Sequence, residues 1–195
     1  MALACDGQLL AEAAQQTESR ATDALGLIEK VLADAGISRD TIEAIAVGLG
    51  PGSYTGIRAA IAVAQGWQLA REIKLLGISS ADALAGQAQA AKIFGRVNVA
   101  IDAQRNEFYL ATWEISEKSC VAVAPLKIVP AADLAARRAA GEMLVGPEQA
   151  VALFPSAAMV ARLAAGRTDF SAGEQLEPVY LRETNFVKAG SGQPS

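Results

Sequence analysis

The sequence contains no histidine among its 195 residues and only two cysteines, Cys5 and Cys120, which lie far apart. The lack of histidine excludes Ser–His–Asp and Cys–His catalysis and imidazole metal sites within this chain. Zinc sites built on cysteine need more than two sulfurs, so a carboxylate site for Mg²⁺ is the metal site that stays open. Two isolated thiols in a cytosolic protein are most often buried and inert, and we expect this of both cysteines.

Aromatic residues and long apolar runs are also scarce. Aromatics make up 5% of the chain, whereas hydrophobic residues make up 52% and are mostly Ala, Val, Leu and Ile, which suits helices packed on a sheet. No uninterrupted apolar run approaches the roughly 20 residues that span a bilayer, so we expect no membrane association. The net charge is −4 and long basic runs are lacking. Binding of a phosphate backbone needs clustered Lys and Arg, so we expect no direct binding to nucleic acid.

Strands and helices alternate in the first half of the sequence, which is typical of α/β crossovers. Short apolar runs predict strands, and apolar residues at helical spacing predict helices. The expected strands are 8–15, 42–49 and 74–78, and the expected helices run from about 21 to 35, from the end of a glycine-rich loop to about 71, and from 80 to about 91.

A second unit is expected to begin near Gly95. A turn is predicted at Gln104-Arg-Asn-Glu107, in which Asn106 is the residue best able to adopt a positive φ. The expected strands are 97–102, 108–115, 126–129 and 143–145, with helices at 131–140 and 156–165 and an irregular stretch at 171–179. The predicted division is an N-terminal domain 1–94, a C-terminal domain 95–189 and a flexible tail 190–195.

The segment Gly50-Pro-Gly-Ser-Tyr-Thr-Gly56 joins a predicted strand to a predicted helix, a place where backbone N–H groups can hold an anion. It fails the Walker A pattern because it contains no lysine. The GxGxxG pattern fits Gly48 and Gly50 just before and at the start of this segment, but it fails because Ser53 stands at the third glycine position. Pro51 removes one N–H from the loop, which weakens it as an anion site. Arg58 lies in the first turn of the predicted helix, where a positive charge is opposed by the helix macrodipole. A tight turn built on glycines, with Ser53 as the helix cap, explains the segment at least as well as anion binding.

The helix after this loop is rich in small residues, which allow close approach of another helix. Alanine is also the best helix former, so the same residues are explained by a helix that lies flat on the sheet. Small residues extend nearly all the way round, whereas the sheet needs one side, so we favour an interface. The candidate loop and interface residues are Gly50, Pro51, Gly52, Ser53, Tyr54, Thr55, Gly56, Arg58, Ala60 and Ala64.

Three motifs, in order and with the right spacing, resemble those of the TsaB (YeaZ-like) family. Residues 50–58, Gly-Pro-Gly-Ser-Tyr-Thr-Gly-Ile-Arg, closely resemble the family signature GPGSFTGLR. Residues 101–109 resemble the DARRxEVY-like opening of the family's second domain, and residues 177–182 resemble its C-terminal EPxYLR segment. Together with their spacing and the pattern between them, these matches cover nearly the whole chain.

The resemblance implies an α/β fold of the actin-like ATPase type (ASKHA, ribonuclease H-like), made of two related α/β domains. It implies a cytoplasmic protein that helps to form N6-threonylcarbamoyladenosine next to the tRNA anticodon. The implied role is a non-catalytic scaffold that activates a TsaD-like transferase, whose metal is held by histidines. The implied partners are that transferase, a TsaE-like small ATPase and a second copy in a homodimer. The chain itself is then expected to hold no catalytic residue and no metal.

The sequence departs from the family at three places, one of which is the absence of the family's histidine early in the first helix, near residues 17–20. Relatives normally open with a strand of the ILAIDTS kind, and the resemblance begins after it. We therefore expect the first strand to be missing, through a late start at Met1 or a true absence. The turn at 104–107 has no glycine, whereas ATP-binding members favour glycines there. We expect no cofactor on the chain alone and a nucleotide only at the interface with a partner, near Asp102 and Arg105.

The alternative function is a stand-alone kinase of the same fold or a glycoprotease-like peptidase. Kinase chemistry needs phosphate loops and metal carboxylates in both domains. Asp102 is a candidate carboxylate of the second domain, but the first-domain loop is lost. Peptidase chemistry needs a nucleophile with a base, or a metal-activated water, and the chain has no histidine for either.

Overall fold

The computed structural model describes residues 1–14 and 23–181, and within them the strands form three sheets. A hairpin pairs β1 (Ala2–Cys5) with β2 (Gln8–Glu12), and a parallel pair joins β3 (Ala44–Gly48) to β4 (Lys74–Ile78). The third sheet has the order β7-β6-β5-β8-β9. Its strands are β5 (Gly95–Asp102), β6 (Glu107–Ile115), β7 (Cys120–Pro130), β8 (Met143–Gly146) and β9 (Val151–Ala152).

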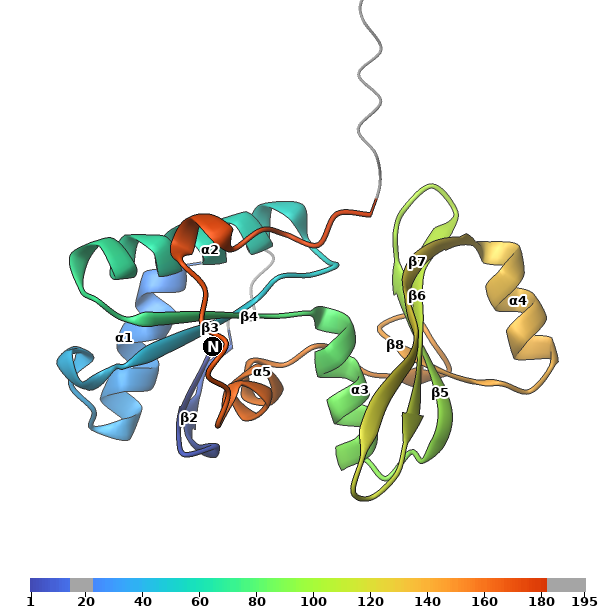
Figure 1. Cartoon of the computed structure of the whole chain (residues 1–195), viewed down its shortest axis with the longest axis horizontal. Helices are drawn as coiled ribbons and strands as arrows, with labels where there is room; N and C mark the ends of the chain where they lie inside the picture. Colours follow the sequence, from blue (N-terminus) through green and yellow to red (C-terminus); the bar gives the residue numbers. More distant parts are fainter. Residues whose placement is uncertain (15–22, 182–195) are drawn as a thin grey trace, which may run out of the picture.

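The helices pack between and around these sheets (Figure 1). They are α1 (Ala24–Ala35), α2 (Tyr54–Ala70), α3 (Ser80–Ala90), α4 (Ala131–Ala139) and α5 (Ala157–Ala164), with 3₁₀ turns η1 (Arg39–Thr41) and η2 (Gly173–Gln175). In the described part of the chain, no helix is both long and apolar enough to cross a membrane.

The alternation of strands and helices predicted from the sequence is confirmed. β7 is longer than the predicted strand 126–129 and pairs with β6 from Cys120 onward. The two-residue strand β9 was missed because it is too short to show a pattern. The end of the predicted strand at Gln15 and the tail 190–195 lie outside the described residues.

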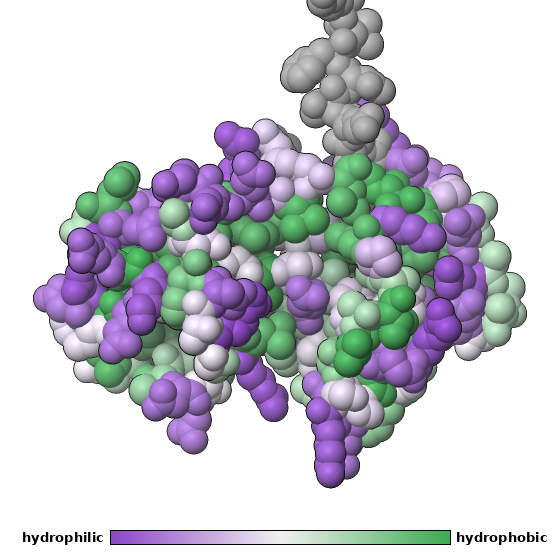
Figure 2. Space-filling view, viewed as in Figure 1, coloured by the Kyte–Doolittle hydropathy of each residue, from purple (hydrophilic) through white to green (hydrophobic). Residues whose placement is uncertain are grey.

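The core of the molecule has two main parts. Helix α3 packs on the five-stranded sheet, where Leu84, Val97 and Val99 are completely buried together with Val145. Helix α2 packs on the β3–β4 pair and forms a separate cluster around Leu75. Hydrophobic side chains also gather on the viewed face where the two units meet (Figure 2).

The end of the chain returns to the first unit. Helix α5 contacts β1, β2, β3 and β4, and η2 contacts α2. Ser171 forms an antiparallel bridge with Leu75 of β4. The five-stranded sheet begins with β5 at Gly95, and the segment after β9 returns to the first unit. The division into domains 1–94 and 95–189 stays a prediction. No local signal in the sequence distinguishes a helix that stays in its own unit from one that crosses back.

The strands of the first unit form two separate pairs. Within the described residues, β1 pairs with β2 alone and β3 pairs with β4 alone, so each has one edge without a partner strand. Helix α5 contacts both pairs and connects them. Isolated two-stranded sheets are marginal in water, and exposed edges invite pairing with other chains. The first unit is therefore the part of the fold in which backbone pairing is least complete.

A strand added before Met1 tests this arrangement. We expect that an Ile-Leu-Ala-Ile-Asp-Thr-Ser extension will raise the melting temperature by roughly 4 °C or more, because it supplies backbone partners to unpaired edges. Self-association should fall at the same time. Differential scanning calorimetry and light scattering measure both effects. A Gly/Ser extension of equal length is the control, and equal melting temperatures for the two forms would contradict the expectation.

Candidate functional site

The glycine loop, residues 48–56, connects β3 to α2 and is held by backbone hydrogen bonds to three other parts of the chain. The N–H of Leu49 donates to the carbonyl of Ile78 at the end of β4, at 2.8 Å. The N–H of Ser80 at the start of α3 donates to the carbonyl of Gly50 at 2.7 Å, and the N–H of Val179 donates to the carbonyl of Leu49 at 2.8 Å. The loop is therefore fixed by β4, α3 and the C-terminal segment.

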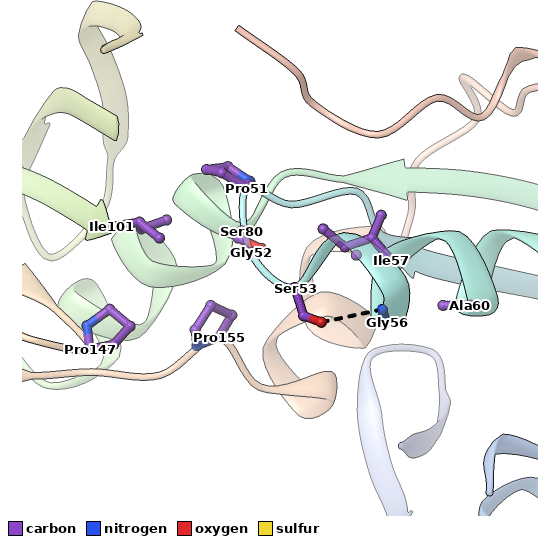
Figure 3. A pocket seen from close by; sticks show the side chains of 11 residues that line it. Pro51, Gly52, Ser53, Gly56, Ile57, Ala60, Ser80, Ile101, Pro147 and Pro155 are labelled. Atoms are coloured by element: carbon purple, nitrogen blue, oxygen red, sulfur yellow. Dashed lines mark hydrogen bonds between the residues drawn. The ribbon is translucent and has the colours of Figure 1, made fainter. Parts of the chain in front are cut away.

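Glycine at position 50 is favoured by its backbone conformation, and the surrounding space is tight. Gly50 has a φ of 88°, and a Cβ there would lie 2.6 Å from Cδ1 of Ile57 and 3.3 Å from the N of Gly52. The following Gly50–Pro51 peptide bond is cis. Ser53 then caps α2, with its Oγ accepting from the N–H of Gly56 at 3.3 Å (Figure 3). The prediction of a tight turn ending in a serine cap is confirmed.

A cavity of about 340 Å³ lies beside this loop, between the two units (Figure 3). The loop and α2 form one wall, and Ile101 of β5, Pro147 and Pro155 form the opposite side. The lining residues are Gly48, Pro51, Gly52, Ser53, Gly56, Ile57, Ala60, Ser80, Ile101, Pro147 and Pro155. None of these residues carries an ionisable side chain. The cavity walls therefore offer neither a cation for a phosphate nor a carboxylate for a metal.

Asp102 and Arg105 are not brought to this cavity. The Oδ1 of Asp102 accepts from the N–H of Gln104 at 2.8 Å and so holds the turn between β5 and β6. Asn106 has a positive φ of 62°, as predicted, and Gln104 and Arg105 also have positive φ values, of 61° and 56°. Three successive non-glycine residues in this region store backbone strain. Asp102 acts here as a turn-forming side chain, which its position after a strand did not distinguish from a metal carboxylate.

Tyr54, Arg58 and Tyr180 form an exposed cluster at the loop end of α2. The rings of Tyr54 and Tyr180 have centroids 5.5 Å apart, and the guanidinium carbon of Arg58 lies 5.4 Å from the centroid of Tyr54. Arg58 also donates to the hydroxyl of Tyr54 at 3.4 Å. Partial burial raises the pKa of the Tyr180 phenol, with a further rise from Tyr54, and Arg58 acts in the opposite direction. Tyr180 was recognised as part of a sequence motif, but not as a neighbour of the glycine loop.

The two interface residues predicted within helix α2, Ala60 and Ala64, differ in burial. Ala60 is exposed, whereas Ala64 is only 1% exposed and packs with Ile61 against the β3–β4 pair. Ala64 is therefore a core residue, and its prediction as an interface residue is corrected. An outward stripe of this helix is formed instead by small residues followed by Leu69, which is 90% exposed. Its residues, Thr55, Ala59, Ala62, Gly66 and Leu69, recur at helical spacing and are all exposed.

A second cavity, of about 210 Å³, lies between α3, α5 and the five-stranded sheet, and Asp82, Cys120 and Arg167 line it together with apolar residues. Burial raises the pKa of the Asp82 carboxyl, and the charge of Arg167 lowers it. Burial and the charge of Asp82 both raise the pKa of the Cys120 thiol. Cys120 is half-buried, whereas Cys5 is exposed, so the expectation of two buried thiols is wrong for Cys5. Among the described residues, no group of three or more His, Cys, Asp or Glu is placed to hold a metal ion.

Comparisons with known proteins relate most of the chain to one family. A family model described as TsaD, tRNA N6-adenosine threonylcarbamoyltransferase, matches residues 12–178. The tRNA threonylcarbamoyladenosine biosynthesis protein TsaB of Escherichia coli is 38% identical over 93 residues, which are 48% of this chain and 40% of that protein. TsaB of Haemophilus influenzae is 35% identical over 100 residues, which are 51% of this chain and 42% of that protein. The chain thus spans less than half the length of these curated relatives.

A solved structure extends the likeness over more of the chain. YeaZ from Pseudomonas aeruginosa superimposes with a TM-score of 0.67 and 29% sequence identity, over 82% of this chain and 84% of that one. The expected actin-like α/β fold of two domains is thereby confirmed.

The two thiols should differ in reactivity. We expect iodoacetamide to alkylate Cys5 faster than Cys120, because the reactive form is the thiolate and the raised pKa of Cys120 lowers its thiolate fraction at a given pH. The rate at Cys120 should continue to rise at alkaline pH, beyond the usual range for a cysteine. Peptide mass spectrometry measures each site separately. The unfolded chain, in which both thiols should react alike, is the control, and equal rates in the folded protein would contradict this assignment.

Proposed function

The chain belongs to the TsaB (YeaZ-like) family, within the group that the TsaD family model describes, and from this we propose that it is a non-catalytic subunit in the formation of N6-threonylcarbamoyladenosine in tRNA. In this proposal it works in the cytoplasm and activates a TsaD-like transferase by binding to it. The transferase supplies the catalytic groups and the contacts with tRNA.

The observation that carries this proposal is the chemistry of the cavity beside the glycine loop. Its lining residues include two serines and no ionisable side chain, and Ser53 already caps α2. A kinase needs cations and metal carboxylates around the transferred phosphoryl group, and a peptidase needs an activated nucleophile or water. The lining favours a binding role for the loop over either alternative.

The outward stripe of α2 supports a role in association. Its residues Thr55, Ala59, Ala62 and Gly66 have short side chains, which let another helix approach the backbone closely. Leu69 adds an exposed apolar side chain at one end of the stripe, and the Tyr54–Arg58–Tyr180 cluster lies at the loop end. Tyrosine and arginine are enriched among the residues that dominate binding energies at protein interfaces.

This stripe is proposed to bind either a second copy or the TsaD-like transferase, so that the homodimer and the heterodimer compete. The TsaE-like small ATPase then binds the assembled pair. Any nucleotide is proposed to bind at the interface with a partner, where Asp102 and Arg105 are the candidate neighbours. Neither Asp102 nor Arg105 lines the cavity within this chain, which agrees with a nucleotide site that is formed together with a partner.

An arginine in the outward stripe tests the proposal. We expect Ala62→Arg to weaken association with the TsaD-like transferase by roughly tenfold or more, because a long charged side chain would be desolvated between two helices. Threonylcarbamoyl transfer to tRNA in a reconstituted mixture should fall with it, and the chain alone should give no transfer. Calorimetric titration measures the affinity, and circular dichroism should show an unchanged helix content.

Two further variants serve as controls for that experiment. Ala135→Arg places the same charge on the exposed side of α4 and should leave association unchanged. Ala64→Arg should unfold the first unit, because Ala64 is buried. Wild-type affinity for Ala62→Arg would refute the proposed binding face, and transfer by the chain without any partner would refute the non-catalytic role.

A further inference from the structure

The C-terminal segment 171–181, called the strap below, lies along α2 and is attached to it at several points. Figure 1 shows this segment, coloured red, crossing α2. The strap begins at β4, where the N–H of Ser171 donates to the carbonyl of Leu75 at 2.9 Å. Two glutamine side chains of α2 then hold Gly173. The Nε2 of Gln65 donates to the Gly173 carbonyl at 2.8 Å, and the Gly173 N–H donates to the Oε1 of Gln68 at 2.7 Å.

The strap continues from the middle of α2 to the glycine loop. Leu176 is 5% exposed and packs in the same core cluster as Ile61 of α2. The N–H of Val179 donates to the carbonyl of Leu49, and the ring of Tyr180 lies against that of Tyr54. The final contacts of the strap are therefore made with the first residues of the loop and of the helix that follows it.

The contacts on α2 follow one helical stripe in the reverse order of the strap. Gly173 meets Gln68 and Gln65, Leu176 clusters with Ile61, and Tyr180 meets Tyr54. The stretch of helix from 54 to 68 rises about 21 Å at 1.5 Å per residue. From 173 to 180 the strap covers about 20 Å, because the 3₁₀ turn η2 rises roughly 2.0 Å per residue and the residues after it roughly 3.3 Å when extended. The two lengths agree, so the strap runs antiparallel to the helix, as the turn η2 followed by a nearly extended segment.

The backbone of the strap approaches α2 closely at the first attachment. A Cβ at Gly173 would lie 2.8 Å from the Oε1 of Gln68 and 3.1 Å from the Cγ of Gln65. The backbone of the strap is therefore seated directly on the side chains of α2. With both ends of the strap fixed in this way, its last contacts hold the loop at a defined position relative to the helix.

We propose that the strap holds the glycine loop in its observed conformation, and that Tyr180 is the positioning residue that fixes Tyr54 and Arg58 at the loop end of the partner-binding face. The first part depends on contacts within this chain alone. The second part rests on the proposed function, because it gives these contacts a consequence for association. The loop is thus placed by residues about 130 positions later in the chain.

Amide hydrogen exchange in the full chain tests the first part. We expect Tyr180→Ala to speed exchange of the loop and first turn of α2, residues 49–58, by roughly three- to tenfold, the factor that corresponds to losing one aromatic pair or hydrogen bond. Exchange in β5 and β6 should stay at the wild-type rate. Tyr180→Phe keeps the ring and should restore the wild-type rate. Phe94→Ala removes an exposed aromatic of similar exposure far from the strap and should leave the loop unchanged.

The possible results test the role of the strap and the proposed function separately. Unchanged exchange at 49–58 in Tyr180→Ala, or equally faster exchange in β5 and β6, would overturn the strap whatever the partner does. If residues 49–58 exchange as fast in Tyr180→Phe as in Tyr180→Ala, the role of the ring is overturned. If the loop loosens while affinity for the TsaD-like transferase stays at the wild-type value, the link to association is overturned. If the wild-type chain binds no transferase, the proposed function fails while the exchange result still decides the strap.

Discussion

Helix α2 packs on two neighbours within the chain, and the first unit depends on both. Ile61 and Ala64 are buried on the β3–β4 pair, and the adjacent stripe, which runs from Gln68 and Gln65 to the edge of Ile61, carries the C-terminal strap. A third stripe of small residues stays open. A helix can present three such surfaces because side chains at intervals of three and four share a face. Ala64 is the small residue at the crowded position, so a larger side chain there would displace the β3–β4 pair.

The cavity at the glycine loop is lined without ionisable side chains. In that cavity the two units contribute prolines, glycines, serines and aliphatic side chains. Asp82 and Cys120 line the other cavity, where their pKa values shift away from the charged form. Such shifts arise when burial is not compensated by a close partner of opposite charge. The junction between the units therefore combines one cavity without ionisable side chains with one in which the pKa values of Asp82 and Cys120 are shifted toward the neutral form.

Much of the fold could be predicted from local patterns. Strands β3 and β4 are short apolar runs, and the glycine loop with its Ser53 cap follows from residues whose conformational preferences are strong. The burial side of α2 could not be predicted, because small residues on nearly every side hide the usual contrast between polar and apolar faces. The place of Tyr180 could not be predicted either. It depends on a contact between segments more than 120 residues apart, for which neither segment carries a local signal.

The crossing of α5 onto the first hairpin has a consequence for synthesis of the chain. Strands β1 and β2 leave the ribosome long before the helix that covers them, which is made roughly 150 residues later. At a synthesis rate of about 5–20 residues per second, helix α5 is made roughly 8 to 30 seconds after the hairpin. Contacts of such long sequence separation also slow the search for the native state. Until α5 emerges, the nascent first unit exposes apolar surface and strand edges, and so it is the part of the newborn protein most suited to capture by a chaperone.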